Sequence, residues 1–328
     1  MSDCFHTLLL LALPASGKSE VRTFLDQRDP AAFHMGPTVQ LDDYPYVHLQ
    51  LLVDEALVAM GEERLYHHPD PKGQRNGPFI DSFDMGGLVQ LLNDDYHELL
   101  TGIADRPESP ARRLLERFDA ASERAGAKAK LRLLSDSVRA KLEVAMQNEA
   151  TAFYEAKAKN VPASLQGRTI VIEFARGGPN TGTMPLPPGY GYKDSLNQLS
   201  PEILANAAVL YIWVDAEESR RKNIERARPN GVDSILFHGT PESVMDQEYG
   251  ACDMTSLIQM SDAPGTLTIE TATKVFYVPV ARFDNRRDLT TFLRKDPSDW
   301  TEAEVAGIHD SLKEACDHLW AAVKKDSR

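Results

Sequence analysis

The sequence has only three cysteines among its 328 residues, and Cys4, Cys252 and Cys316 lie far apart. None of them has the paired spacing that is typical of a zinc site, and scattered thiols argue against a disulfide framework. Free thiols are usual in a reducing compartment. We therefore expect the protein to be cytoplasmic.

Long hydrophobic runs are also absent. The apolar run of residues 7–13 is too short to cross a bilayer. A secretory signal would need basic residues before its apolar core, whereas residues 1–6 contain Asp3 and neither Lys nor Arg. We expect no membrane partner.

An excess of basic residues is the third absence. The chain has 36 Lys and Arg against 49 Asp and Glu, which gives a formal net charge of −13. Because Lys and Arg supply most of the non-specific affinity for nucleic acid, this balance argues against nucleic acid as a partner. With 42% hydrophobic residues and no internal repeat, the chain can bury a substantial core.

The most informative segment joins the apolar run of residues 7–13 to a turn and then to a helical pattern in residues 20–27. This arrangement is typical of a phosphate-binding loop, in which backbone N–H groups surround a polyphosphate, a lysine reaches the outer phosphates and a serine hydroxyl ligates Mg²⁺. The full pattern has glycine where this chain has Ala12, and a methyl group fits there if φ is negative. The alternative is an ordinary turn with a surface lysine. The expected nucleotide-binding residues are Pro14, Ala15, Ser16, Gly17, Lys18 and Ser19.

Short apolar runs predict the sheet. They are residues 7–13, 39–41, 169–174, 209–214 and 274–280. Helical patterns separate them, so we predict an α/β fold with a parallel five-stranded sheet between two helical layers.

The middle of the chain has a different pattern. Residues 86–159 have no strand signal, while apolar residues recur there at helical spacing, which predicts a helical insertion. Residues 66–85 are rich in Gly, Pro, Asp and His and indicate an irregular loop that could lie over a substrate. We predict a core of residues 1–65 and 165–328, and an acceptor or lid region of residues 66–164. A capping box at Thr301 and Glu304 predicts a terminal helix.

Two carboxylates, Asp42 and Asp43, follow the second predicted strand. Parallel sheets bind ligands beyond the carboxyl ends of their strands, so one of the pair is well placed as a base for an acceptor hydroxyl. The other is a candidate substrate contact. The alternative is an Asx turn that satisfies nearby backbone N–H groups.

Residues 13–19, followed by Asp42, Asp43 and Tyr44, resemble the P-loop kinases of the P-loop NTPase superfamily. The resemblance is closest to the branch that holds polynucleotide 5′-kinases and zeta-toxin-like sugar-nucleotide kinases. It implies a three-layer αβα sandwich with strand order 2-3-1-4-5, and it implies that Asp42 is the catalytic base. Pro45 stands where an arginine often follows in that branch, which argues against nucleic acid as the acceptor.

The third predicted strand ends in Glu173, the pattern of a carboxylate that orients Mg²⁺, and Arg176 in the next loop is a candidate clamp for a substrate oxygen. A structural pair between Glu173 and Arg176 is the alternative. After the fourth strand, Arg221 and Arg226 resemble the lid arginines of P-loop kinases, which stabilise charge on the transferring group. The alternative is a solvated helix with ion pairs at helical spacing.

Together these features predict an ATP-dependent kinase that uses Mg²⁺ and moves the γ-phosphoryl group to a hydroxyl of an unidentified small molecule. Lys18, Asp42, Arg221 and Arg226 are the expected catalytic residues, and Ser19 and Glu173 the expected metal ligands. A nucleoside, nucleotide or polynucleotide 5′-kinase is one alternative. A P-loop ATPase or nucleotide-dependent regulatory module is the other.

Overall fold

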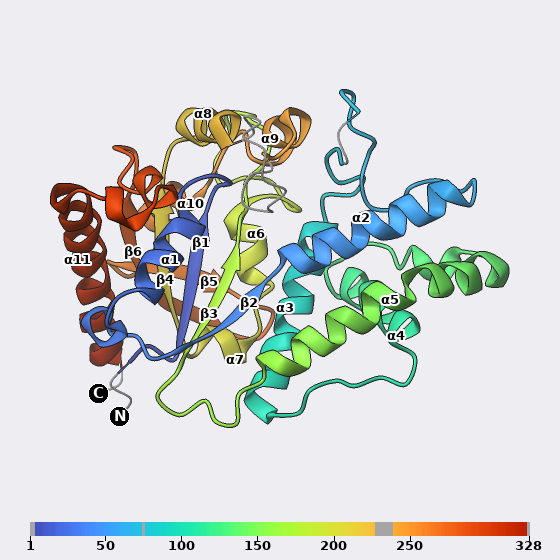
Figure 1. Ribbon diagram of the computed structural model, residues 1–328, viewed down its shortest axis with the longest axis horizontal. Coiled ribbons are helices and arrows are strands. Elements are labelled where there is room, and N and C mark those ends of the chain that lie inside the picture. The colour runs from blue at the N-terminus through green and yellow to red at the C-terminus, as the bar shows by residue number, and fades with distance from the viewer. Residues whose placement is uncertain (1–3, 74–75, 227–238, 327–328) are drawn as a thin grey trace.

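The computed structural model describes residues 4–73, 76–226 and 239–326 (Figure 1). Its centre is a six-stranded sheet with the order β2-β3-β1-β4-β6-β5. Its strands are β1 (Thr7–Ala12), β2 (Thr38–Asp42), β3 (Thr169–Phe174), β4 (Ala207–Trp213), β5 (Thr266–Glu270) and β6 (Val275–Asp284). All neighbours pair in parallel except β5 and β6, which are antiparallel. The protein is therefore α/β, with one mixed sheet.

The α-helices of the described residues follow the chain in this order: α1 (Lys18–Asp26), α2 (Tyr44–Ala59), α3 (Asp84–Thr101), α4 (Pro110–Arg124), α5 (Asp136–Asn160), α6 (Gly191–Asn197), α7 (Pro201–Leu204), α8 (Ala216–Arg226), α9 (Glu242–Glu248), α10 (Met254–Met260) and α11 (Glu302–Asp326). The capping box is confirmed, because the Thr301 N–H donates to the Glu304 carboxylate at 2.9 Å and the Glu304 N–H donates to Thr301 Oγ1 at 3.2 Å.

The prediction of an all-parallel five-stranded sheet was wrong, because it missed β5. This strand alternates, with Leu267 and Ile269 buried while Glu270 is exposed. Alternation of this kind is typical of a strand with one buried face, whereas the prediction rested on the continuous apolar runs of parallel strands. A short turn, in which the Thr271 N–H donates to the Lys274 carbonyl at 3.0 Å, returns the chain to β6 as a hairpin.

Helices cover both faces of the sheet, and β1 is buried along its whole length. Successive residues of a strand point to opposite faces. Leu8 and Leu10 accordingly share one apolar core with α1 and α11, while Leu9 and Leu11 share another with α3, α6, α7 and α10. The result is three layers, with the sheet in the middle.

A third apolar core lies in the helical part of the molecule, on the right in Figure 1, where α2, α3, α4 and α5 pack together. Leu88 of α3, Leu114 of α4 and Leu142 of α5 are buried there. The domain boundaries predicted at residues 66 and 164 remain a prediction. Helix α2 lies on the sheet side of the predicted boundary at residue 66, yet its Leu49 packs into this helical core.

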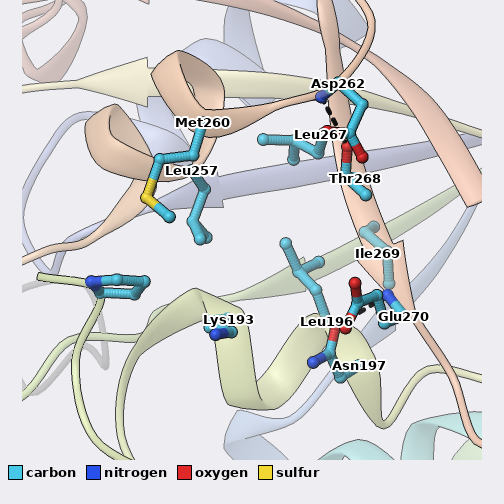
Figure 2. A pocket seen from close by; sticks show the side chains of 11 residues that line it. Lys193, Leu196, Asn197, Leu257, Met260, Asp262, Leu267, Thr268, Ile269 and Glu270 are labelled. Atoms are coloured by element: carbon cyan, nitrogen blue, oxygen red, sulfur yellow. Dashed lines mark hydrogen bonds between the residues drawn. The ribbon is translucent and has the colours of Figure 1, made fainter.

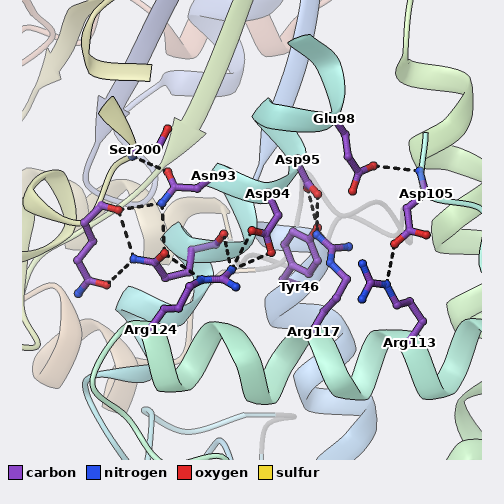
Figure 3. Close-up of polar contacts among 12 residues, drawn as sticks. Tyr46, Asn93, Asp94, Asp95, Glu98, Asp105, Arg113, Arg117, Arg124 and Ser200 are labelled. Atoms are coloured by element: carbon purple, nitrogen blue, oxygen red, sulfur yellow. Dashed lines mark hydrogen bonds and ion pairs between the residues drawn. The ribbon is translucent and has the colours of Figure 1, made fainter. Parts of the chain in front are cut away.

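One buried polar network joins all four helices of this part. Asp95 of α3 accepts hydrogen bonds from the Tyr46 hydroxyl of α2 at 2.6 Å and the Arg117 guanidinium of α4 at 2.8 Å (Figure 3). The Lys157 ammonium of α5 lies 2.6 Å from the same carboxylate. Burial raises the pKa of Tyr46 well above its ordinary value. Because Tyr46 lies in the first turn of α2, the network fixes the start of the helix that follows Asp42 and Asp43.

Among the described residues, no helix has both the length and the apolar character needed to cross a bilayer. The cytoplasmic location remains a prediction.

Candidate active site

The predicted phosphate-binding loop connects the buried end of β1 to the first turn of α1. Ala15 has φ of 55° and Gly17 has φ of 94°, so alternate residues of the loop are left-handed. Alternation between left- and right-handed residues turns successive backbone N–H groups toward one side and forms a concave anion site. Helix α1 begins at Lys18 with Gly17 as its N-cap, which adds the partial positive charge of a helix N-terminus.

Ala12 stands where the full motif has glycine, and the structure gives the reason. It is the last residue of β1 and is fully buried in extended backbone, so the position does not need glycine. The sharp turns fall later, at Ala15 and Gly17.

Lys18 and Glu173 lie close together, whereas the alternative pair of Glu173 with Arg176 is not formed. The Lys18 ammonium is 3.8 Å from Glu173 Oε2, and the Arg22 guanidinium donates to Glu173 Oε1 at 3.0 Å. Burial raises the pKa of Glu173, and the charges of Lys18 and Arg22 oppose that effect. Arg22 is not among the predicted site residues. Its position four residues after Lys18, on the same face of α1, was the available signal.

Asp42 lies next to this cluster, because it pairs in register with Glu173 across β2 and β3. Its Oδ1 accepts a hydrogen bond from the Tyr44 N–H at 2.9 Å, which is the Asx-turn contact of the alternative interpretation. The side chain is partly exposed. The contact uses one carboxylate oxygen, so a role as base stays a prediction compatible with this geometry.

Asp43 and Arg176 form a buried pair. Arg176 Nη1 is 2.6 Å from Asp43 Oδ2, and Arg176 is only 2% exposed. The same guanidinium donates to Ser195 Oγ and to the Met85 carbonyl, each at 3.1 Å. Burial raises the pKa of Asp43, and Arg176 opposes it. Arg176 thus fastens the start of α2 to the helical layer, and its predicted role as a substrate contact stays untested.

The predicted lid arginines lie on α8. Arg221 contacts Glu218 at 2.6 Å and Glu225 at 2.6 Å, three and four residues away, which is the arrangement of the solvated-helix alternative. The side chain of Arg226 lies outside the described residues. Whether either arginine contacts a nucleotide therefore stays a prediction.

The loop of residues 66–85 packs against α9. The Ser243 hydroxyl donates to Asp70 at 2.7 Å, Lys72 pairs with Glu242, and the Phe79 N–H donates to Glu248. Burial raises the pKa of Glu248 to about 8, against the opposing effects of the Phe79 N–H and Arg176. Glu248 was missed, because nothing near it in the sequence indicates that it lies close to Arg176.

Among the described residues, no group of three or more His, Cys, Asp or Glu side chains is arranged to hold a metal ion. The proposed Mg²⁺ ligands do not form such a group, because Ser19 contributes a hydroxyl and Glu173 a single carboxylate. His67 contacts a carboxylate in another part of the molecule. Its Nδ1 lies 3.2 Å from Asp54 Oδ2 in the helical part.

A cavity of about 190 Å³ lies between β5, α6 and α10 (Figure 2). Lys193, Leu257 and Ile269 are among its lining residues, and none of the phosphate-loop residues is. It is therefore separate from the cluster around Lys18.

No protein-family model matches the chain, and comparisons with curated proteins and with solved structures also find no match.

Proposed function

We propose that the protein is an ATP-dependent kinase of the P-loop type, which transfers the γ-phosphoryl group to a hydroxyl of a small molecule. The observation that carries this proposal is the loop between β1 and α1. Its left-handed residues Ala15 and Gly17 form an N–H concavity at a helix N-terminus, and Lys18 follows directly. This combination suits the β- and γ-phosphates of a nucleotide.

The residues next to the loop fit a magnesium nucleotide. Mg²⁺ prefers carboxylate, hydroxyl and phosphate oxygens, which Glu173 and Ser19 would provide together with the substrate. When bound, the ion neutralises charge on the phosphate oxygens. In this chain Lys18 and Arg22 lie within 3.8 Å and 3.0 Å of Glu173 and favour its ionised form. The oxygen set and its charge are therefore suitable.

Asp42 is the proposed base. It pairs with Glu173 of the neighbouring strand and is the last residue of β2, at the edge of the sheet where an acceptor would meet the γ-phosphate. Taking a proton from the acceptor hydroxyl during transfer is worth about 10² to 10⁴ in rate. The remaining catalysis comes from alignment and electrostatic stabilisation, without a covalent enzyme intermediate.

The burial and hydrogen bonding of Arg176 favour a hydroxyl acceptor over a phosphate acceptor. Kinases that phosphorylate a phosphate need free arginines at the acceptor, whereas the Arg176 guanidinium is buried and bonded to Asp43, Ser195 and Met85. The net charge of −13 and Pro45 argue in turn against a polynucleotide. Nucleosides, sugars and sugar nucleotides all have suitable hydroxyl groups.

A regulatory ATPase is the second candidate. It is favoured by exposed apolar side chains in the helical part, where Ile103 is 70%, Leu133 is 78% and Val144 is 79% exposed. Such side chains are typical of surfaces that contact a partner when they gather in one patch. Slow ATP hydrolysis with no phosphorylated small molecule would support this candidate.

Nucleotide binding is tested with Lys18→Ala. Calorimetry with ATP and Mg²⁺ should show binding by the unchanged protein and little or none by the variant, because the ammonium is a main contact to the outer phosphates. Lys313→Ala removes an exposed ion pair with Asp317 on α11 and should bind normally. An unchanged protein that binds neither adenine nor guanine nucleotides would overturn the proposal.

Transfer is tested by incubating the protein with ATP, Mg²⁺ and a metabolite extract. Mass spectrometry should show a gain of about 80 Da, one phosphoryl group, on one metabolite. Asp42→Asn should keep its ATP affinity and lose at least about tenfold in transfer rate, because the amide cannot accept the proton. A variant with normal transfer would remove Asp42 from the role of base and would favour a phosphate acceptor.

A further inference from the structure

The carbonyl oxygens of the phosphate-binding loop are held by side chains from distant parts of the chain. The Ala12 carbonyl accepts from the Tyr192 hydroxyl at 2.9 Å, the Pro14 carbonyl from the Ser219 hydroxyl at 2.7 Å, and the Ser16 carbonyl from the Asn285 amide at 2.7 Å. Tyr192, Ser219 and Asn285 are all fully buried. Alternate peptide groups from the end of β1 through the loop are thus fixed by buried side chains.

The orientation of these peptide groups matters for anion binding. In a trans peptide the carbonyl of one residue and the N–H of the next point in opposite directions. The carbonyls of Pro14 and Ser16 are held toward Ser219 and Asn285. The N–H groups of Ala15 and Gly17 therefore point the opposite way, toward the concave side of the loop. These two residues are the left-handed ones. A carbonyl that turned inward would repel a phosphate oxygen.

Both N–H groups of the Asn285 side-chain amide are used in hydrogen bonds, so neither is free to contact a ligand. Its amide nitrogen also donates to Thr290 Oγ1 at 2.8 Å, and its side-chain oxygen accepts from the Leu289 N–H at 2.7 Å. The segment is packed tightly on Gly17, because a Cβ built on Gly17 would lie 2.4 Å from Thr290 Oγ1. The segment after β6 therefore supports the loop from behind.

Helix α8 is connected to the loop contacts of both Ser219 and Asn285. Ser219 and Lys222 lie on one face of it, three residues apart. Lys222 is only 1% exposed, and its ammonium lies 3.0 Å from Asp288 Oδ1 and 3.5 Å from the Asn285 carbonyl. Helix α8 thus contacts the loop directly through Ser219 and indirectly through the segment that contains Asn285.

We propose that Ser219 and Asn285 are positioning residues for the phosphate-binding loop. They keep the carbonyls of Pro14 and Ser16 turned away from the concave side of the loop, so that its N–H groups are available to a polyphosphate. The proposal rests on the proposed function for the identity of the ligand. Neither residue contacts the ligand. Each acts through the loop backbone, and both join that backbone to the helix that carries Arg221.

The experiment uses Ser219→Ala and Asn285→Asp in the full-length protein. Ser219→Ala removes one donor, while Asn285→Asp keeps the size and shape of the side chain and places an acceptor oxygen against the Ser16 carbonyl. Hydrogen exchange of the amides in residues 13–19 should become at least about threefold faster in both variants without nucleotide, because the held peptide groups gain freedom. The dissociation constant for ATP with Mg²⁺ should rise about tenfold, the value of one hydrogen bond.

Matched controls separate this role from a general loss of stability. Ser261→Ala removes a serine that donates to the Ala263 carbonyl at 3.2 Å, and Asn206→Asp removes an amide that donates to the Glu202 carbonyl at 3.0 Å. Both controls should leave exchange in residues 13–19 unchanged. Unchanged exchange in Ser219→Ala and Asn285→Asp would overturn the inference. Faster exchange in a protein that binds no nucleotide would uphold it and would overturn the proposed kinase instead.

Discussion

Gly17 combines two constraints at a single residue. Its φ of 94° is in the left-handed region, where a side chain is strained. A Cβ there would also lie 2.4 Å from Thr290 Oγ1 and 2.7 Å from Asn285 Nδ2. The first constraint belongs to the backbone, and the second arises only because a distant segment packs on the loop. Both act on the peptide groups that would contact phosphate.

Gly17→Ala should therefore lower the free energy of unfolding by about 2 to 4 kcal/mol and weaken ATP binding. Urea unfolding and calorimetry measure the two effects. Gly102→Ala is the matched control, because Gly102 has φ of 67° with open space around it. In that control the backbone strain acts alone. The free energy of unfolding should fall by about 1 to 2 kcal/mol, and the nucleotide affinity should be normal. Equal effects in both variants would show that contact with Asn285 and Thr290 is unimportant.

Glu248 makes stability depend on pH. Burial raises its pKa from 4.5 to about 8 in the folded protein. Below pH 4.5 the carboxyl is protonated in both states, and as pH rises toward 8 the unfolded chain loses the proton first. The free energy of unfolding should therefore fall across this window, by up to roughly 5 kcal/mol from this group alone.

Glu248→Gln should remove that part of the pH dependence, because glutamine does not ionise and its oxygen can still accept from the Phe79 N–H. Denaturant unfolding between pH 5 and 8.5 should show a flatter profile for this variant, which is more stable than the unchanged protein at the upper end. Glu63→Gln, at an exposed position, should keep the original profile. Parallel profiles for all three proteins would contradict the assignment to Glu248.

At the scale of elements, the four helices α2 to α5 are joined by charge as well as by apolar packing. Asp95 is close to two cations, Arg117 at 2.8 Å and Lys157 at 2.6 Å, and Arg117 is only 4% exposed. Burial alone would lower the pKa of Arg117, but Tyr46 and Asp95 raise it above its ordinary value. Removing the carboxylate charge would leave Arg117 buried without its carboxylate partner, while Lys157 would keep Glu98, 2.8 Å away.

Asp95→Asn should accordingly lower the free energy of unfolding by about 3 to 5 kcal/mol. The neighbouring Asp94→Asn is an unusually close control, since Asp94 pairs with Arg124 at the surface, where such a pair is worth about 0 to 1 kcal/mol (Figure 3). Urea unfolding of the two variants should therefore differ by several kilocalories per mole. Similar midpoints would mean that Arg117 finds another partner in the folded state.

Element prediction succeeded where local pattern and burial agree. The apolar runs of β1, β3 and β4 predict strands that are buried on both faces, and the capping box predicts the start of α11. It failed at β5, where an edge strand has one buried face and only Leu267 and Ile269 mark it. A strand that is buried on both faces has a longer apolar run than a strand that is buried on one face, so it is easier to predict from the sequence.

For the whole molecule, the sequence by itself determined the α/β class, the helical character of the middle of the chain, the placement of Asp42 and Glu173 at strand ends, and that of Lys18 after the loop that follows β1. These features depend on local periodicity and on the rule that parallel strands end at one edge of a sheet. Only the tertiary structure decided that Arg22 pairs with Glu173, that Arg176 pairs with Asp43, and that Glu248 is buried. It also decided which distant side chains hold the carbonyls of residues 12–16. Such contacts join residues far apart in the chain, and burial and hydrogen bonding between them leave no periodic trace in the sequence.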